Sequence, residues 1–469
     1  MRLSEQNTAA LDPQVTRLDY DRAGEAKQIV HLGMGAFTRA HQAVFTEDAI
    51  AASGELWRIV GVSMRSSAVH DQLAPQDHLF TVTSKGHGTP ETRLIRCVGD
   101  IIVAPENPEE VISAIADART HIVTLTVTEK GYHLTADSGS ASLDPLLQDD
   151  PARPVPRTIY GFLAKGLKQR MDRGLPGLTV LSCDNLADNG TRLGHMLLAI
   201  LSATDPALAD WCERTCTFPC SMVDRIVPAT QTGDIDALES RIGARDEAAV
   251  FTEPFRQWVI EDRFAGPRPA WEAAGAQIVA DVHPYETAKL RMLNGAHSAL
   301  AYLGLAKGLE LVSEAIADPE IGPLVGSLMR DEATASFTPA PGQDLEVYAA
   351  SLEARFANPA LPHRLAQIAM DGSQKIPQRW LAPLADRQAQ GLSSPATLQA
   401  LAAWILHVRG DNPYVSDPRA KTMAAAWQTS GRDGIVKALF GEDGLISSPW
   451  QPTADDLQRV QHHLKTMAD

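Results

Sequence analysis

Hydrophobic and polar positions are arranged in two ways along the chain. Up to residue 283, short apolar runs alternate with longer stretches in which apolar residues recur every three or four positions. The first pattern predicts buried strands and the second predicts helices. The strand runs are residues 28–32, 57–62, 79–83, 122–127 and 178–182, and the helical stretches include 109–118 and 158–173. Because parallel strands need a crossover between them, this alternation predicts an α/β fold with a mainly parallel sheet.

After Pro284 the pattern changes to alanine- and leucine-rich helical periodicity, with loops at 339–342 and 410–413. This part is therefore predicted to be mostly α-helical. A chain of 469 residues is too long for one ordinary core. No Gly/Ser/Pro-rich spacer separates the halves, so we predict two domains in direct succession, residues 1–283 and 284–469.

Composition excludes several classes of protein. Hydrophobic residues make up 44% of the chain and charged residues 21%, a balance that excludes a disordered or fibrous protein. The net charge of -16, without a long Lys/Arg run, excludes a nucleic-acid or anionic-membrane partner. No stretch is apolar enough to span a bilayer, and the start lacks the apolar core of a signal peptide. Five cysteines, an odd number, favour a reducing compartment, so we expect a cytoplasmic protein.

A glycine turn follows the first predicted strand. Gly33 and Gly35 precede a helical stretch that begins near Phe37, and small residues there let backbone amides approach a pyrophosphate. Thr38 stands where a third glycine is usual, so the fingerprint is incomplete, and a simple tight turn is the alternative. The position in the first strand–helix unit favours a dinucleotide site, and hence a Rossmann-type N-terminal domain.

The residues after the second strand bear on the choice of cofactor. An acidic residue there binds the ribose hydroxyls of NAD, whereas an arginine accommodates the extra phosphate of NADP. The chain has Arg65 and no carboxylate until Asp71. Arg65 is thus a candidate cofactor contact, with stacking on the adenine or simple solvation as alternatives. We predict NAD, with NADP possible.

A predicted helix over residues 283–297 carries a polar stripe. With Lys289 at zero, Glu286 lies at roughly 60°, His297 at roughly 80° and Asn294 at roughly 140° around an α-helix. Polar groups on a buried face are costly unless they serve one another or a ligand. A solvated face is the alternative, but the neighbouring positions 290, 292, 293 and 300 are apolar and favour burial.

These residue types suit the oxidation of a secondary alcohol. The reaction needs a base for the hydroxyl proton, and a desolvated Lys289 supplies one because burial lowers the pKa of an amine. Asparagine amides stabilise the developing alkoxide, and Glu286 is placed to pass the proton to solvent. Tyr285-x-x-x-Lys289 also fits the Tyr/Lys pair of short-chain dehydrogenases, but its position late in the chain disfavours that interpretation.

We predict no metal site. Cys212, Cys216 and Cys220 are spaced by four, but Pro219 interrupts any helix there and no nearby histidine completes a set of ligands. Structural cysteines are the better interpretation.

Several segments together resemble the long-chain mannitol dehydrogenases. They are residues 33–41, 126–132, 182–186, 222–226, 253–258, 289–297 and 371–375. The resemblance implies a nicotinamide cofactor, no metal, a lysine base, and a Rossmann-type domain followed by a mostly helical one. That family also has phenylalanine after Gly-x-Gly-x, so the missing third glycine no longer counts against cofactor binding.

The resemblance also implies roles for individual residues. Lys289 is the general base, Asn185 and Asn294 form the oxyanion site, and His297 orients the substrate hydroxyls. Glu286 remains the proton relay. Asp224 and Lys375 fall where the family contacts substrate or shapes the pocket. The cofactor contacts expected from the matching segments and the glycine turn are Gly33, Gly35, Phe37, Arg65 and Asp184.

Three positions bear on the substrate. Mannitol dehydrogenases have an arginine where this chain has Gln367, and residues 367–379 look like the fructuronate reductases of the family. Arg379 is a candidate clamp for a substrate carboxylate, with an interdomain salt bridge as the alternative. Arg291, at roughly 200° on the helix, is predicted to form a structural ion pair instead.

We therefore predict a metal-independent oxidoreductase that resembles fructuronate reductase (D-mannonate oxidoreductase). Mannitol 2-dehydrogenase or a related polyol dehydrogenase is the alternative, and a non-catalytic dinucleotide sensor is an alternative of another class. The expected partner is a small keto sugar acid, sugar alcohol or keto sugar. The protein is expected to be a monomer or a small homo-oligomer.

Overall fold

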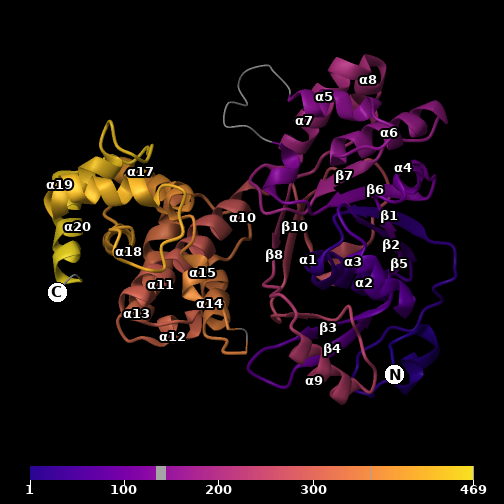
Figure 1. Ribbon diagram of the computed structural model, residues 1–469, viewed down its shortest axis with the longest axis horizontal. Coiled ribbons are helices and arrows are strands. Elements are labelled where there is room, and N and C mark those ends of the chain that lie inside the picture. Colours follow the sequence, from indigo (N-terminus) through magenta and orange to yellow (C-terminus); the bar gives the residue numbers. More distant parts are fainter. Residues whose placement is uncertain (134–143, 361, 468–469) are drawn as a thin grey trace. The chain divides into compact units, whose positions relative to one another are not determined.

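The chain folds into two compact units, Met1–Val282 and His283–Asp469. The computed structural model describes residues 1–133, 144–360 and 362–467 (Figure 1). Within these ranges, none of the helices combines the length and the apolar character needed to cross a membrane.

The first unit is built on a five-stranded parallel sheet in the order β5-β2-β1-β6-β7. The strands are β1 (Lys27–Leu32), β2 (Trp57–Ser63), β5 (Val98–Val103), β6 (Thr120–Leu125) and β7 (Thr179–Ser182). This is the strand order of a Rossmann fold, and the order reverses between β1 and β6. Ligands of such sheets bind outside the carboxyl ends of the strands at this reversal.

Helices cover both faces of this sheet, which explains why its strands are mostly buried instead of alternating between buried and exposed residues (Figure 1). Val30 and Leu32 of β1 pack toward one cluster with the helices α4, α6, α7 and α8, whereas Ile29 packs toward the other with α2. The helices are α2 (Gln42–Ser53), α4 (Pro108–Ala116), α6 (Ile159–Asp172), α7 (Asn189–Thr204) and α8 (Pro206–Thr215). The predicted α/β domain with a parallel sheet is confirmed.

Two small sheets complete the first unit, with the orders β4-β3-β9 and β11-β10-β8. Their strands are β3 (Phe80–Ser84), β4 (Glu91–Ile95), β8 (Ser221–Asp224), β9 (Val250–Thr252), β10 (Gln257–Glu261) and β11 (Gln277–Val279). The predicted strand at 79–83 therefore exists as β3, but it lies outside the main sheet and pairs antiparallel with β4.

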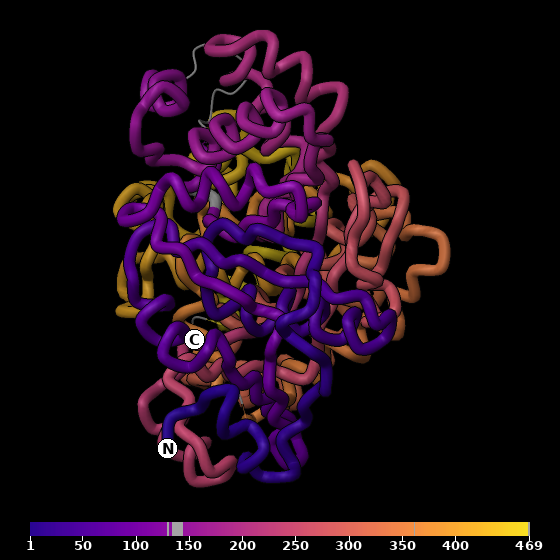
Figure 2. The backbone as a smooth tube through the Cα atoms, turned by 90° about the vertical axis from the view of Figure 1, so that its right-hand side faces the viewer, coloured from indigo at the N-terminus to yellow at the C-terminus, as the bar shows by residue number. Residues whose placement is uncertain are grey.

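The N-terminal segment lies beside α9 (Thr232–Ile242) at the bottom of Figures 1 and 2. The amide of Leu3 donates to the carbonyl of Arg245 at 2.9 Å, and Leu3 and Leu11 are buried with Leu238 and Ile242. The other short elements of this unit are η1 (Glu5–Ala10), α1 (Ala36–Ala40), α3 (Ala68–Leu73), η2 (Ala74–Gln76), η3 (Glu129–Tyr132), α5 (Pro145–Asp149), η4 (Asp150–Ala152) and η5 (Trp271–Ala274).

The second unit is helical, which confirms the predicted change of pattern. Its helices are α10 (His283–Ala288), α11 (Gly295–Ala306), α12 (Val312–Ala317), α13 (Ile321–Ser327), α14 (Leu345–Phe356), α15 (Leu365–Ile368), α16 (Gly372–Ile376), α17 (Ala382–Ala389), α18 (Pro395–His407), α19 (Ala420–Phe440) and α20 (Ala454–Thr466). A 3₁₀ turn, η8 (Thr334–Ser336), and three π-helical segments, η6 (Lys289–Asn294), η7 (Leu328–Ala333) and η9 (Pro377–Leu381), lie between them. Helices α11 and α18 are apolar on most sides and form the centre of the core.

Candidate functional site

The glycine turn lies at the carboxyl ends of β1 and β2. The amides of Gly33 and Met34 both donate to the carbonyl of Val62, at 2.9 and 3.0 Å. Gly33 has a φ of 95°, and a Cβ there would lie 2.1 Å from the carbonyl oxygen of Thr126. Only glycine fits this position. The turn therefore stands at the strand reversal, with backbone close to the space that a dinucleotide pyrophosphate takes in such folds.

Thr38, in place of the third glycine, ties the turn to the strands below it. Its hydroxyl lies 2.7 Å from Nε2 of His31 and 3.0 Å from Oγ1 of Thr126. Thr126 in turn donates to the carbonyl of Gly33 at 3.0 Å. Complete burial lowers the pKa of His31 to about 3, so the ring is neutral at physiological pH. Sequence reasoning missed this network, although a histidine inside an apolar strand is a signal for it.

Gly35 and Phe37 occupy the start of α1. Gly35 precedes the first helical residue and accepts from the amide of Arg39 at 3.2 Å. The ring of Phe37 stacks on His41 at 5.0 Å between centroids, with an interplanar angle of 15°. Both residues lie on the segment that leads away from Gly33, and their contact with a cofactor stays a prediction.

Arg65 lies two residues beyond β2 and is exposed. Within the described part of the chain its side chain has no hydrogen-bond or ion-pair partner. Asp71, the first carboxylate after the strand, accepts from Ser67 at 2.8 Å. The end of β2 thus presents a cation and no acid to the adenosine side of a Rossmann site.

Asp184 has partners of its own in the protein. Its carboxylate accepts from the amides of Val127 and Thr128, at 2.9 and 3.0 Å, and from the hydroxyl of Tyr132 at 2.8 Å. Burial raises the pKa of Asp184, and these hydrogen bonds oppose the shift. The carboxylate therefore holds the loop after β6 against the loop after β7. A direct role in cofactor binding stays a prediction, and Asn185, the next residue, is exposed on the same loop.

Asp224 is buried at the end of β8, opposite Gln257 of β10. The neighbouring Arg225 donates to the carbonyls of Ala40 and Glu253, and burial lowers its pKa to about 9. Sequence reasoning did not single out Arg225. It joins the end of β8 to the end of α1, and so to the segment that carries the glycine turn.

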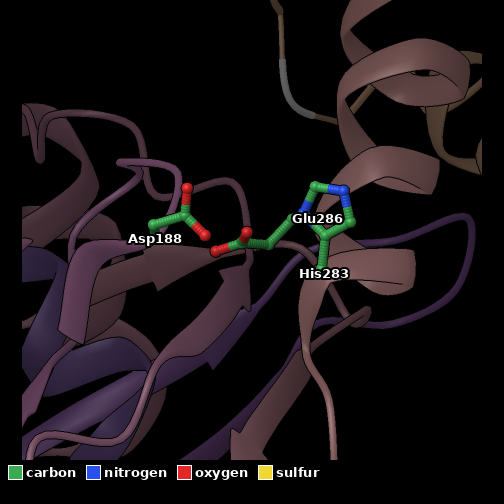
Figure 3. Close-up of side chains that lie close together, drawn as sticks. All are labelled: Asp188, His283 and Glu286. Atoms are coloured by element: carbon green, nitrogen blue, oxygen red, sulfur yellow. The ribbon is translucent and has the colours of Figure 1, made fainter. Parts of the chain in front are cut away.

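In the second unit, the predicted catalytic helix is interrupted. Figure 3 shows His283 and Glu286 on the first turn of α10. Beyond α10 the chain continues as the π-helical segment η6, in which the amide of Gly295 donates to the carbonyl of Leu290, five residues back. The expectation of one regular α-helix over 283–297 is therefore wrong, and the angles calculated for it do not hold past Lys289. A π turn contains more residues than an α turn, so residues five apart, such as Lys289 and Asn294, lie nearer the same face.

Lys289 and Asn294 are the first and last residues of η6, and both are half-buried. Met292 and Leu293, between them, are buried in the core of the unit. Arg291 donates to the carbonyl of Ser336 at 2.6 Å and pairs with Asp386 at 2.7 Å, which confirms the predicted structural ion pair.

His297 lies in the first turn of α11. Its ring packs against Phe356 at 4.7 Å and His363 at 5.3 Å between centroids. Burial holds the pKa of His297 well below its usual range, and the charges of Arg355 and Arg379 add to the effect. A neutral imidazole both donates and accepts. Its Nε2 has no hydrogen-bond partner among the described residues, so it is free to bind a hydroxyl group.

Lys375 is placed by the turn that opens α16. Asp371 has a φ of 56°, and a Cβ on Gly372 would lie 2.4 Å from Nε1 of Trp404. The amide and hydroxyl of Ser373 donate to Asp417 at 2.7 and 2.6 Å. Lys375 donates to the carbonyl of Met370 at 2.7 Å, and burial, together with the charge of Arg379, lowers its pKa.

Arg379, in η9, contacts the end of η6 and the first turn of α11 in its own unit. Its Nη1 donates to Oγ of Ser298 at 2.8 Å and to the carbonyl of Asn294 at 3.3 Å. It forms no ion pair with the described carboxylates of its own unit, and the interdomain salt bridge stays an alternative prediction. The structure thus brings Lys289, Asn294, His297 and Arg379 to neighbouring segments of one unit, while the predicted residues Asn185, Asp184 and Asp224 belong to the other.

Comparisons with known proteins assign both units to one family. Residues 27–273 match the mannitol dehydrogenase Rossmann domain, and residues 281–451 match the mannitol dehydrogenase C-terminal domain. The two matches together account for most of the chain.

Individual relatives cover nearly the whole length. D-mannonate oxidoreductase of Escherichia coli is 40% identical over 454 residues, which is 94% of this chain and 93% of the relative. Mannitol 2-dehydrogenase of Phaeosphaeria nodorum is 37% identical over 458 residues, which is 94% of this chain and 80% of the relative. The solved structure of Pseudomonas fluorescens mannitol 2-dehydrogenase, a ternary complex with NAD and D-mannitol, is 34% identical, with a TM-score of 0.83 over 100% of this chain and 97% of that one.

Proposed function

The chain belongs to the mannitol dehydrogenase family of oxidoreductases, and from that premise we propose that it reduces a keto sugar acid to a hydroxy sugar acid, as a fructuronate reductase (D-mannonate oxidoreductase) does. The observation that carries the proposal is the π-helical segment η6, which has a lysine at its first position and an asparagine at its last. The amine can exchange a proton with the substrate oxygen, and the carboxamide can donate a hydrogen bond to that oxygen while negative charge develops on it.

The residues of the glycine turn fit a nicotinamide cofactor. The tight turn after β1 requires glycine at position 33, where a side chain would meet the carbonyl of Thr126. At Gly35 an added Cβ would meet one protein atom within 4 Å, at 3.7 Å, so the backbone there is open to a pyrophosphate. When bound, the cofactor supplies or accepts the hydride. We propose NAD, because a relative of known structure holds NAD. NADP is the alternative, because Arg65, which has no side-chain partner among the described residues, offers a contact for its extra phosphate.

In the oxidation direction, Lys289 removes the hydroxyl proton as hydride leaves the carbon, and in the reduction direction it returns the proton. The side-chain amides of Asn185 and Asn294 donate to the same oxygen while its negative charge develops. Glu286, one turn before Lys289, passes the proton to solvent. The neutral ring of His297 orients a neighbouring hydroxyl group.

The sugar itself is held by Asp224 and Lys375 in this proposal. Lys375 is half-buried, and its one acceptor among the described residues is the carbonyl of Met370, so its ammonium retains donors for a carboxylate or a hydroxyl group. The 40% identity to D-mannonate oxidoreductase and the presence of Gln367 support a sugar acid as substrate.

A polyol is the second candidate substrate. Mannitol 2-dehydrogenase from Phaeosphaeria nodorum is nearly as similar, at 37% identity, and its match covers the same 94% of this chain. The residues proposed for proton transfer suit either substrate, because the reacting carbinol is the same.

Substrate panels decide between these candidates. Fructuronate, tagaturonate, fructose and xylulose are each assayed with NADH and with NADPH, and we expect the highest kcat/KM for fructuronate. Turnover of fructose without turnover of fructuronate would overturn the sugar-acid proposal. Absence of turnover across the whole panel would support a dinucleotide sensor instead.

We propose the cytoplasm as the location of the enzyme. The five cysteines are free thiols and all are buried, as expected for a protein that folds under reducing conditions.

A further inference from the structure

Two π-helical segments of the second unit are joined by side-chain hydrogen bonds. Arg379 and Trp380 are neighbours in η9, and both donate to the point where η6 becomes α11. Arg379 donates to the carbonyl of Asn294, and Nε1 of Trp380 donates to the carbonyl of Gly295 at 3.1 Å. Arg379 also reaches Ser298, one turn further. Three hydrogen bonds thus fix this junction from outside the helix.

The contact is largely buried and carries a charge. Trp380 and Ser298 are each 1% exposed, and the hydrogen bond of Trp380 is fully buried, whereas the two hydrogen bonds of Arg379 are partly buried. Burial lowers the pKa of Arg379 to about 10, which leaves it a cation at neutral pH. Burying a guanidinium without a carboxylate is costly, and the acceptors on Asn294 and Ser298 offset only part of that cost. A neutral side chain would avoid this cost, so the guanidinium at position 379 calls for a functional explanation.

The junction determines where the Asn294 amide points. A π-helical segment is rarer than an α-helix, and its extra residue is absorbed locally. If η6 returned to α-helical hydrogen bonding, each residue beyond the change would rotate by about 100° relative to Lys289. Asn294, as the last residue of η6, would lose its alignment with Lys289 first.

We propose that Arg379 is a positioning residue. By donating to the carbonyl of Asn294 and the hydroxyl of Ser298, it holds the π-to-α junction and so aims the Asn294 amide at the substrate oxygen. This inference rests on the proposed function, in which Asn294 donates to that oxygen. It replaces the sequence-based hypothesis that Arg379 clamps a substrate carboxylate.

The two roles for Arg379 predict different kinetics. R379A is assayed with a neutral substrate, fructose, and with a carboxylate substrate, fructuronate. A positioning residue lowers kcat by a similar factor for both, about 10²-fold, with KM nearly unchanged. A clamp would raise KM for fructuronate and spare fructose, and that result overturns the proposal. Added guanidinium ion should restore part of the kcat of R379A.

A double-mutant cycle tests whether Arg379 acts through Asn294. N294A, R379A and the double variant are compared, and we expect the double variant to be about as slow as N294A alone. If the two losses multiply, Arg379 acts independently and the positioning role is wrong. If N294A retains wild-type kcat, the role of Asn294 in the proposed function fails, which is a separate outcome.

Three further variants separate positioning from folding. R379K keeps the charge with a single donor group, so its kcat should fall between those of R379A and the wild type, and it replaces R379A in the comparison if R379A does not fold. S298A removes one acceptor and leaves Asn294, so its loss should be smaller than that of R379A. R291Q alters an arginine in η6, the segment that carries Asn294. Arg291 pairs with Asp386, so this variant should lower the melting temperature while leaving kcat within about twofold.

Discussion

Lys289 is the residue on which the proposed chemistry depends. K289A removes the base from the first position of η6, and general acid–base catalysis contributes about 10²–10⁴-fold to a rate. We expect kcat to fall by at least about 10²-fold. Binding of NADH, measured by quenching of tryptophan fluorescence, should stay close to the wild-type value, because the glycine turn belongs to the other unit.

A matched control is available one helical position away. Leu290 is half-buried and carries no titratable group, so L290A should retain most of the wild-type kcat. Substantial turnover by K289A at neutral pH, with L290A equally active, would show that the base is another residue.

Arg65 is the residue that we expect to determine how the enzyme ranks the two nicotinamide cofactors. R65Q removes the only cation directly after β2 and leaves the main-chain turn intact. A guanidinium–phosphate contact contributes about 1.5–3 kcal/mol, so kcat/KM for NADPH should fall roughly 10-fold or more while that for NADH changes little. Equal losses with both cofactors would indicate that Arg65 stacks on the adenine, and no loss with either would indicate a solvated side chain.

At the scale of elements, the glycine turn depends on a hydroxyl group that the glycine pattern does not include. T38V keeps the shape of Thr38 but leaves Nε2 of His31 and Oγ1 of Thr126 without its hydroxyl. His31 Nε2 keeps Oγ1 of Thr126 at 3.0 Å, so the variant loses buried hydrogen bonds without leaving that nitrogen unsatisfied. A buried hydrogen bond contributes about 0.5–1.5 kcal/mol, so the melting temperature should fall modestly. Because Thr126 also holds the carbonyl of Gly33, the affinity for NADH should fall as well.

T38S, which retains the hydroxyl, is the control for this network and should bind NADH nearly as well as the wild type. If T38V and T38S bind NADH equally, the network stabilises the fold without shaping the turn. Both affinities are obtained from one fluorescence titration of each variant.

The elements that sequence reasoning predicted are those with a strong apolar period. Strands β1, β2, β6 and β7 are mostly buried on both faces because helices cover both sides, and their apolar runs stand out in a sequence. The strand β5 was missed because Gly99 and Asp100 break its apolar run, although it completes the sheet beside β2. The pairing of β3 with β4 and β9 was not predictable, since partners far apart in the chain leave no local pattern.

In the candidate site, too, the residues on one helix were predicted and the contacts from distant segments were not. Composition of the segment 283–297 predicted Lys289, Asn294 and His297 on one helix, and all three lie on the continuous run of α10, η6 and α11. The π-helical hydrogen bonding was not predictable, because the apolar period does not distinguish a π turn from an α turn, and the contacts at its end come from residues 85 positions further along the chain. Ser298 and Trp380 were missed for the same reason.

At the scale of the whole molecule, both units bury neutral histidines, and this makes the stability of the protein depend on pH. His31 and His41 in the first unit have pKa values lowered to about 3 by burial, and burial lowers the pKa of His407 in the second unit to about 4. An unfolded histidine has a pKa near 6.5. Between pH 6.5 and these lower values the unfolded chain binds more protons than the folded one, so stability falls as the pH falls.

His407 offers the cleanest test of this dependence. At pH 5 its folded form is neutral and its unfolded form is protonated, which costs about 2 kcal/mol of stability relative to pH 7.5. H407Q removes the titrating ring and retains an amide that can meet Asn412, the hydrogen-bond partner of His407 at 2.8 Å. Between pH 7.5 and pH 5, the melting temperature of the wild type should therefore fall further than that of H407Q.

The buried carboxylates Glu47 and Asp246, whose pKa values burial raises, act in the opposite direction, but they are common to both proteins and cancel in the comparison. Parallel melting curves for the two proteins across this range would show that His407 gains its proton in the folded state.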